Sequence, residues 1–207
     1  YLLIEGDKPD AIKDPAVLKA IDELQVYLTT RPNIGKVMSI AEFIKRMNQS
    51  MNSDKPEFFK IPDKQETIAE YLLLYSMSGE PGDFDPYVDY DYRLANMVVF
   101  THSDSTADMH VLWSEIQAFV KDKFPPNIKV NIGGSVAQSA AITDVIVKDK
   151  ILNVIQIASV VLLATAFVFR SFIAGLLVVT PLLLSVLVNM GLMGWLGMRL
   201  NVPTALT

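Results

Sequence analysis

Two histidines and two aspartates in one short segment are the first residues that could do chemistry: His102, Asp104, Asp108 and His110. These residue types can bind a divalent metal. Two histidines eight residues apart, however, match none of the compact spacings of structural zinc sites. The segment also has the composition of a helix start, where Ser and Asp side chains accept hydrogen bonds from unpaired amides. We favour the helix start and predict no metal site.

Four aspartates, Asp83, Asp85, Asp89 and Asp91, form a second acidic group between two apolar segments. Carboxylates at this density could attract calcium, but the spacing lacks the glycine and the terminal glutamate of an EF-hand loop. We therefore favour a solvated loop over a calcium site.

The pair Gly133–Gly134 precedes a predicted helix, whose first amides could seat an anion. The chain has neither a Walker lysine nor a GxGxxG motif, so we favour a turn and predict no cofactor. It also lacks GxSxG and HExxH motifs, and it contains no cysteine. We identify no catalytic residue and predict that the protein is not an enzyme.

The charged residues are confined almost entirely to the first three quarters of the chain. Every Asp and Glu precedes Ile151, and only Arg170 and Arg199 are charged after it. The acidic, mixed-charge segment 1–150 has no basic surface for nucleic acid, so we predict no nucleic-acid partner. It is long enough to form a domain with its own core.

The uncharged segments 151–169 and 172–198 have the length and composition of membrane-spanning helices. Only Arg170 and Ser171 separate them, so the two helices must be antiparallel neighbours whose turn lies on the opposite side from residues 1–150. Arg170 favours the cytoplasm for the turn, although Lys148 and Lys150 oppose this orientation. We predict an extracytoplasmic domain at 1–150.

Five residues within the predicted spans interrupt the apolar sequence: Asn153, Gln156, Pro181, Ser185 and Asn189. The last three recur every four residues and so share one helix face. This polar membrane face could border a conduction path, or it could pack against further helices, which we favour.

The segment 1–150 is predicted to be an α+β domain containing two β-α-β units, the composition of a ferredoxin-like split sheet with helices on one face. The predicted strands are 1–5, 35–40, 94–101 and 128–132, and the predicted helices are 15–30, 41–51, 62–77 and 105–123. Because no proline or glycine occurs between Gly134 and Phe169, we expect one helix of about 35 residues to enter the membrane.

An apolar surface for cargo is a further hypothesis for the domain, carried by Met47, Met51, Leu72 and Met77. Methionine and leucine offer an adaptable apolar surface. Core packing is the alternative that we favour for these residues.

Several segments resemble the RND superfamily of exporters, in particular its MMPL-like branch. They are VMSIAEFIKRMNQSM, IAEYLLLYSMSG, the IGGS turn, FRSFIAGLLVVTPLLLSVLVNMGLMGWLG and LNVPTALT. The resemblance implies that the chain holds part of a porter domain and the second and third helices of a six-helix repeat. It also implies proton-driven export of hydrophobic or lipid-like molecules by a multi-pass protein of the cytoplasmic membrane.

The expected partners are membrane lipids, the cargo, the other transmembrane helices of the same protein, and a homo-oligomer or an adaptor protein. The resemblance places the proton-coupling acids beyond Thr207, and we expect the natural chain to extend past both ends. The same helix arrangement also resembles that of sterol-sensing receptors and of accessory subunits of protein export. A lipid sensor or such a subunit therefore remains the alternative.

Overall fold

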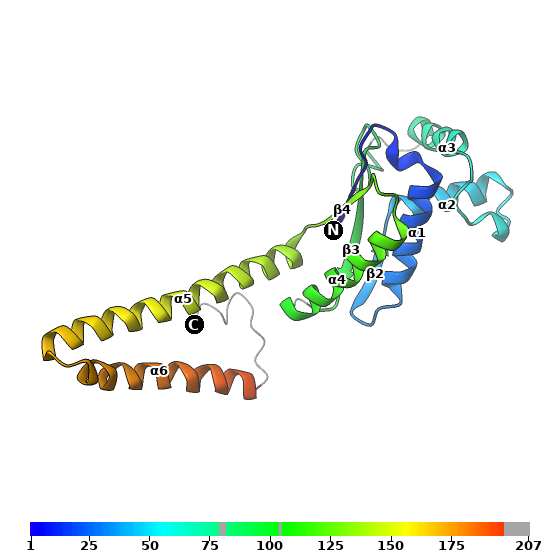
Figure 1. The fold of residues 1–207 in the computed structure, drawn as a ribbon. Helices are drawn as coiled ribbons and strands as arrows, with labels where there is room; N and C mark the ends of the chain where they lie inside the picture. The colour runs from blue at the N-terminus through cyan, green and yellow to red at the C-terminus, as the bar shows by residue number, and fades with distance from the viewer. Residues whose placement is uncertain (79–81, 104, 197–207) are drawn as a thin grey trace. The chain divides into compact units, whose positions relative to one another are not determined.

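The computed structural model describes residues 1–78, 82–103 and 105–196, which form an α+β domain and a helical hairpin (Figure 1). In chain order the elements are β1 (Leu2–Glu5), η1 (Ala11–Lys13), α1 (Pro15–Thr29), β2 (Ile34–Met38), α2 (Ile40–Met51), η2 (Pro56–Phe58), α3 (Gln65–Ser78), β3 (Leu94–Thr101), α4 (Thr106–Lys123), β4 (Lys129–Ile132), α5 (Ser135–Phe169) and α6 (Phe172–Trp195).

The predicted elements are confirmed, with ends that differ by a few residues. The short 3-10 helices η1 and η2 were not predicted, because a single turn leaves no periodic pattern in the sequence. Pro15 begins α1, and the Asp14 carboxylate accepts a hydrogen bond from the Ala16 amide at 2.8 Å. Proline at the first position and a capping aspartate before it are typical helix-start signals.

The four strands form one sheet in the order β2-β3-β1-β4, and every neighbouring pair is antiparallel. Consequently β1 and β2, which α1 connects, run in the same direction with β3 between them. The strands β3 and β4, which α4 connects, likewise enclose β1. Leu3 of β1 lies opposite Asn96 of β3 and Asn131 of β4, which fixes the register across three strands.

The core of the domain lies between one face of this sheet and the helices α1 and α4. Leu2 and Ile4 of β1 are 2% and 0% exposed and share a buried cluster with Leu24 of α1. Tyr27 of α1 and Phe119 of α4 meet at a ring-centroid distance of 5.1 Å, so the two helices lie side by side. The residues that alternate with these core residues along each strand point away from the core, because successive side chains of a strand lie on opposite faces of the sheet.

The helix α2 is tied to α1 by a buried ion pair. The Lys45 ammonium lies 2.6 Å from an Asp22 oxygen, and Lys45 is only 7% exposed as a residue. A buried ammonium is tolerated because a carboxylate accompanies it, and the ring of Phe59 lies 4.7 Å from it.

Asn48 of α2 connects three segments of the domain. Its amide nitrogen donates to the carbonyl oxygens of Phe58 and Lys60, each at 2.9 Å. Its amide oxygen accepts from the hydroxyl of Tyr71 in α3 at 3.1 Å and from the side chain of Asn52 at 3.2 Å. Asn48 is 6% exposed, and its hydrogen-bonding groups fasten the loop after α2 to both helices.

Beyond the sheet, α5 is a single helix of 35 residues, as predicted. Gly134 precedes it with φ +93°, and a Cβ at this position would lie 2.9 Å from the Tyr1 ring. The glycine therefore makes the turn that the sequence favoured. The chain forms two compact units, of which the first contains residues 1–104 and 108–135 and the second contains residues 105–107 and the α5–α6 hairpin.

Candidate functional site

The turn between α5 and α6 is built from the two residues predicted for it, Arg170 and Ser171. The Ser171 amide donates to the Ala166 carbonyl oxygen at 3.1 Å, and the Arg170 amide donates to the Phe167 carbonyl oxygen at 3.3 Å. This pair of bonds is the Schellman ending of a helix, in which Arg170 adopts φ +49°. The Ser171 hydroxyl oxygen then accepts from the Ala174 amide at 3.4 Å and caps α6. Two residues thus end one helix and start the next.

The two helices of the hairpin meet closely at Gly175 of α6, which is buried together with Val179. A Cβ at Gly175 would lie 2.9 Å from the Leu162 carbonyl oxygen and 3.2 Å from the Thr165 hydroxyl oxygen of α5. Small residues let helix backbones approach in this way in membranes, where packing replaces the hydrophobic effect as the driving force.

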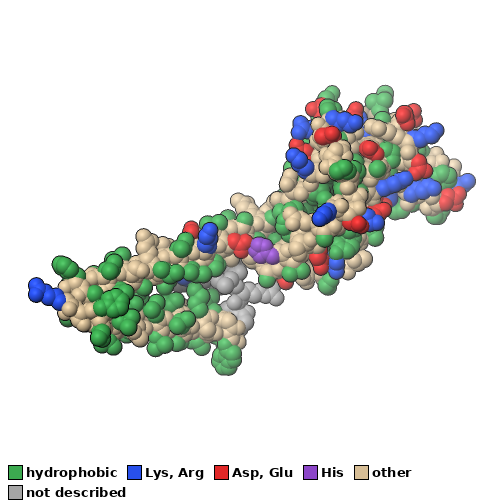
Figure 2. All heavy atoms as spheres, in the orientation of Figure 1, with side chains coloured by type: hydrophobic (Ala, Val, Ile, Leu, Met, Phe, Trp, Pro, Cys, Tyr) green, Lys and Arg blue, Asp and Glu red, His purple; other side chains and the backbone are tan. Residues whose placement is uncertain are grey.

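Outside this contact, most of the hairpin surface is uncovered. Of the most apolar stretches of α5 and α6, 6% and 11% of the residues are buried, and both helices are long enough to cross a membrane. Figure 2 shows hydrophobic side chains over the hairpin and charged side chains gathered on the domain. A surface of this kind is compatible with lipid or with other apolar helices.

The hydroxyl groups of the hairpin fall into two classes. Those of Ser159, Thr165 and Thr180 donate to carbonyl oxygens four residues earlier at 2.6–2.8 Å, which satisfies them within their own helices. Ser185 is exposed and makes no side-chain hydrogen bond to any residue that the structure describes. Intrahelical bonding thus explains how the first three hydroxyls are accommodated among apolar residues.

The polar side chains predicted for the membrane face resemble Ser185, because their polar atoms are not satisfied within the described part of the hairpin. Asn153 and Gln156 of α5 and Asn189 of α6 are exposed, and they too have no side-chain hydrogen bond within the described residues. Pro181, Ser185 and Asn189 lie together in a hollow of about 440 Å³ on α6. The hollow is completed by Leu184, Val188 and Leu192.

The four residues of the hypothetical cargo surface have different environments in the domain. Leu72 is 2% exposed and Met47 packs against the core, whereas Met51 and Met77 are 54% and 78% exposed. On α3, Leu73 and Leu74 are exposed in addition to Met77, which leaves an apolar surface on this helix.

Three of the aspartates considered for metals, Asp83, Asp89 and Asp108, accept hydrogen bonds within the domain. One Asp89 oxygen accepts from the amides of Arg93 and Leu94, both at 2.8 Å, and so closes the loop before β3. Asp83 accepts from the Tyr75 hydroxyl at 2.9 Å. Among the described residues there is no group of three His, Cys, Asp or Glu that could hold a metal.

The histidine segment is held at the β2–β3 end of the sheet. The His102 amide donates to the Asn33 carbonyl oxygen at 2.9 Å, and an Asp108 oxygen accepts from the Ser103 hydroxyl at 2.7 Å. The predicted ligand Asp104 lies outside the described residues.

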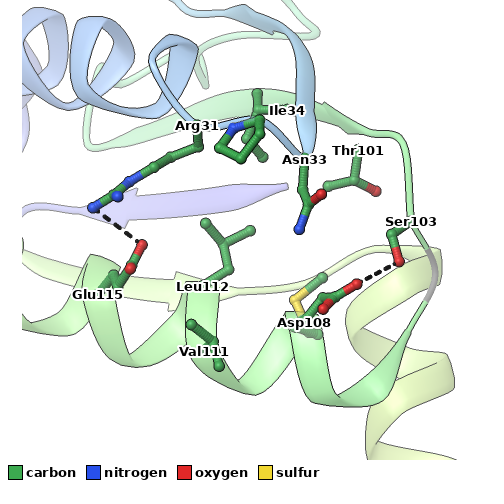
Figure 3. Close-up of a pocket in the computed structure, with 11 residues that line it drawn as sticks. Arg31, Asn33, Ile34, Thr101, Ser103, Asp108, Val111, Leu112 and Glu115 are labelled. Carbon is green, nitrogen blue, oxygen red and sulfur yellow. Dashed lines mark hydrogen bonds and ion pairs between the residues drawn. The ribbon is translucent and has the colours of Figure 1, made fainter.

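A pocket of about 250 Å³, which was not predicted, lies at this end of the domain between β2, β3 and α4 (Figure 3). Its residues are Arg31, Pro32, Asn33, Ile34, Thr101, Ser103, Asp108, Met109, Val111, Leu112 and Glu115. The pocket exists because β2 and β3 pair with Ile34 opposite Thr101. Both strands were predicted, but their pairing and register are long-range properties that local patterns do not reveal.

An α+β domain followed by an exposed apolar hairpin is the arrangement of a membrane protein. The family model of the MMPL family matches residues 22–205, so the chain belongs to the MMPL family, as the resemblance predicted. A protein of Methanocaldococcus jannaschii, named as a membrane protein, is 23% identical to this chain over 200 residues. The match covers 97% of this chain and 49% of that relative, so the chain spans about half the length of the curated relative it matches.

Proposed function

We propose that the chain is part of an RND-type permease that exports hydrophobic or lipid-like molecules with energy from a proton gradient. The observation that carries this proposal is the MMPL match over residues 22–205, which includes most of the α+β domain and both apolar helices. The strand order β2-β3-β1-β4, with α1 and α4 as connections, supports a ferredoxin-like porter domain for residues 1–150.

The polar membrane face is proposed to contact other transmembrane helices of the same protein. Asn153, Gln156, Ser185 and Asn189 support this role because they have no hydrogen-bond partner within the hairpin that the structure describes. An amide group in hydrocarbon is costly unless another helix or a water-filled cavity satisfies it. Pro181 lacks the amide hydrogen that would bond to the carbonyl oxygen one turn earlier, which leaves that oxygen open to a donor from another helix.

The turn at Arg170 and Ser171 is proposed to face the cytoplasm, with residues 1–150 on the opposite side of the cytoplasmic membrane. Arg170 at the turn supports this orientation by the positive-inside rule, whereas Lys148 and Lys150 at the opposite end count against it. Residues 1–207 contain no cysteine, so Ser171→Cys in the full-length protein, with any cysteine outside this range replaced, gives a defined site for a membrane-impermeant maleimide and keeps the charge of Arg170. Labelling is expected only after the cytoplasmic side is opened, and labelling of intact cells from outside would contradict the orientation.

The long helix α5 is proposed to transmit movement between the porter domain and the membrane hairpin. Its 35 residues are helical without interruption from Ser135 to Phe169, which supports a stiff connection. The exposed residues Met51, Met77 and Leu73 support a cargo-contacting surface on the domain.

A transport measurement with the full-length protein tests the proposed function. Liposomes containing the purified protein and a fluorescent lipid should move the lipid between leaflets when a pH gradient is imposed. Collapse of the gradient with a protonophore should stop this movement, and protein-free liposomes provide the control. Lipid movement at the same rate without a gradient would contradict proton-driven transport, and lipid binding without movement would favour a lipid sensor.

A further inference from the structure

The pocket between β2, β3 and α4 has an apolar interior. Ile34 and Met109 are 6% and 9% exposed, and Leu112 of α4 lines the pocket between them and the Glu115 end (Figure 3). Its volume of about 250 Å³ is slightly below the roughly 300–1,000 Å³ of drug-sized pockets. The space therefore suits a short apolar segment of a ligand better than a large ring system.

Each charged side chain at the rim of this pocket already has a partner. The Arg31 guanidinium lies 3.3 Å from a Glu115 oxygen and also donates to the Tyr27 hydroxyl. The hydrogen bond from Arg31 to Tyr27 raises the pKa of Arg31, so the guanidinium stays charged. At the other end of the pocket, Asp108 accepts from Ser103. These pairings largely neutralise the charges of the rim, and the buried Arg31 Nε, which has no hydrogen-bond partner among the described residues, is a further donor at this end.

Two uncharged polar groups at the pocket remain available. The Asn33 side-chain amide and the Thr101 hydroxyl make no hydrogen bond to any residue in the part of the chain that the structure describes. Asn33 precedes β2 and extends toward α4, with Thr101 beside it (Figure 3). The backbone fixes both positions. The Asn33 carbonyl oxygen accepts a hydrogen bond from the His102 amide, and Ile34 pairs with Thr101 across the two strands. The pocket thus offers a neutral donor and a neutral acceptor beside an apolar interior.

We infer that this pocket binds the apolar end of an uncharged amphipathic molecule, whose hydroxyl, ester or amide group hydrogen-bonds to Asn33 and Thr101. Apolar lining with a few fixed polar groups is the usual composition of a small-molecule site. The inference rests on the proposed function and deepens it, since the pocket would select neutral molecules among hydrophobic cargoes.

Photolabelling of the full-length protein in detergent, without any proton gradient, tests the site. The probe is a decanol analogue that carries a diazirine on its alkyl chain, and labelled peptides are identified by mass spectrometry. Labelling is expected on the peptides that contain Ile34, Met109 and Leu112. Unlabelled decanol should reduce it at concentrations about five-fold lower than decanoate or decylammonium, which corresponds to about one hydrogen bond.

Matched variants separate the pocket from general partitioning of the probe. Leu112→Trp should fill the pocket and abolish the labelling, whereas Val26→Trp, at a position 57% exposed on α1, should leave it unchanged. Asn33→Leu changes an exposed residue before β2 and should remove the preference for decanol over decanoate. This variant tests the site even if Leu112→Trp does not fold.

Equal labelling of the wild type and Leu112→Trp would overturn the inference, as would labelling confined to α5 and α6. Stronger competition by decanoate or by decylammonium would also overturn it, because the ligand would then be charged. The labelling needs no gradient, so absent lipid transport together with pocket labelling would contradict only the proposed function. Transport without pocket labelling would contradict only this inference.

Discussion

Gly175 lies so close to Leu162 that a Cβ at position 175 would be 2.9 Å from the Leu162 carbonyl oxygen. Within the described residues, α5 and α6 bury few other side chains, which makes this approach a main contact of the hairpin. At Gly191, farther along α6, a Cβ would have no described atom within 4 Å apart from its chain neighbours and its own helix backbone. The two glycines therefore differ in environment although they share one helix.

Gly175→Ala is expected to push the two helices apart and to destabilise the hairpin by about 1–3 kcal/mol, as overpacking does elsewhere. Gly191→Ala is the matched control and should be neutral or slightly stabilising, because alanine is the better helix former. Thermal unfolding of the full-length protein in detergent measures both. Equal unfolding temperatures for the two variants would show that the close approach contributes nothing to stability.

Arg170→Gly is expected to stabilise the turn by about 1 kcal/mol, because Arg170 has a left-handed backbone that costs a side-chain-bearing residue energy. Ser171→Ala should have the opposite effect of about 1 kcal/mol, since it removes the cap of α6. The same thermal measurement distinguishes them. If Arg170→Gly proved destabilising, the arginine side chain would have a stabilising role that outweighs its strain.

The sequence predicted the elements of this protein better than their assembly. The period of Val17, Ile21 and Leu24 identified α1, and the absence of proline and glycine after Gly134 identified α5, because both signals are local. The polar membrane face of Pro181, Ser185 and Asn189 follows from four-residue spacing alone, and its role stays a prediction. The pocket at Asn33 was missed because it depends on strand pairing between distant segments.

Asn48→Ala is expected to destabilise the domain by about 1–2 kcal/mol, because it removes the hydrogen bonds from the Asn48 amide to the carbonyl oxygens of Phe58 and Lys60 and leaves the Tyr71 hydroxyl without its acceptor. Hydrogen exchange of the full-length protein should show faster exchange in residues 52–61. Met51→Ala, at a 54% exposed position of the same helix, is the control and should leave this segment protected. Unchanged exchange in Asn48→Ala would mean that the loop is held by its apolar contacts alone.

The ion pair between Lys19 and Asp63 predicts a specific pH dependence. The Lys19 ammonium hydrogen-bonds to Asp63 at 2.6 Å and lowers the pKa of that carboxyl below its ordinary value of 3.8. A lowered folded-state pKa stabilises the fold above pH about 4, and this stabilisation is lost as the pH falls through the folded-state value. The destabilisation caused by Lys19→Met should therefore be present at pH 7 and disappear in strong acid.

Denaturant midpoints of the wild type and Lys19→Met between pH 7 and pH 2 measure this difference. In an Asp63→Asn background, Lys19→Met should show no such pH dependence, because the titrating carboxyl is gone. Both partners are well exposed, with side-chain exposures of 49% and 81%, so the effect should also shrink at high salt. A difference that is independent of pH would assign the role of Lys19 to packing instead of charge.

A proline in the middle of α5 tests whether this helix transmits movement. Val147→Pro would remove an internal hydrogen bond and kink the helix between the domain and the hairpin, at a cost of about 3 kcal/mol. We expect lipid transport in liposomes to be lost, while hydrogen exchange in α1 and the membrane insertion of the hairpin remain as in the wild type. Val147→Ala keeps the helix intact and should retain transport. Full transport by Val147→Pro, or a mobile, unprotected segment at 144–151 in the wild type, would show that a stiff α5 is not required.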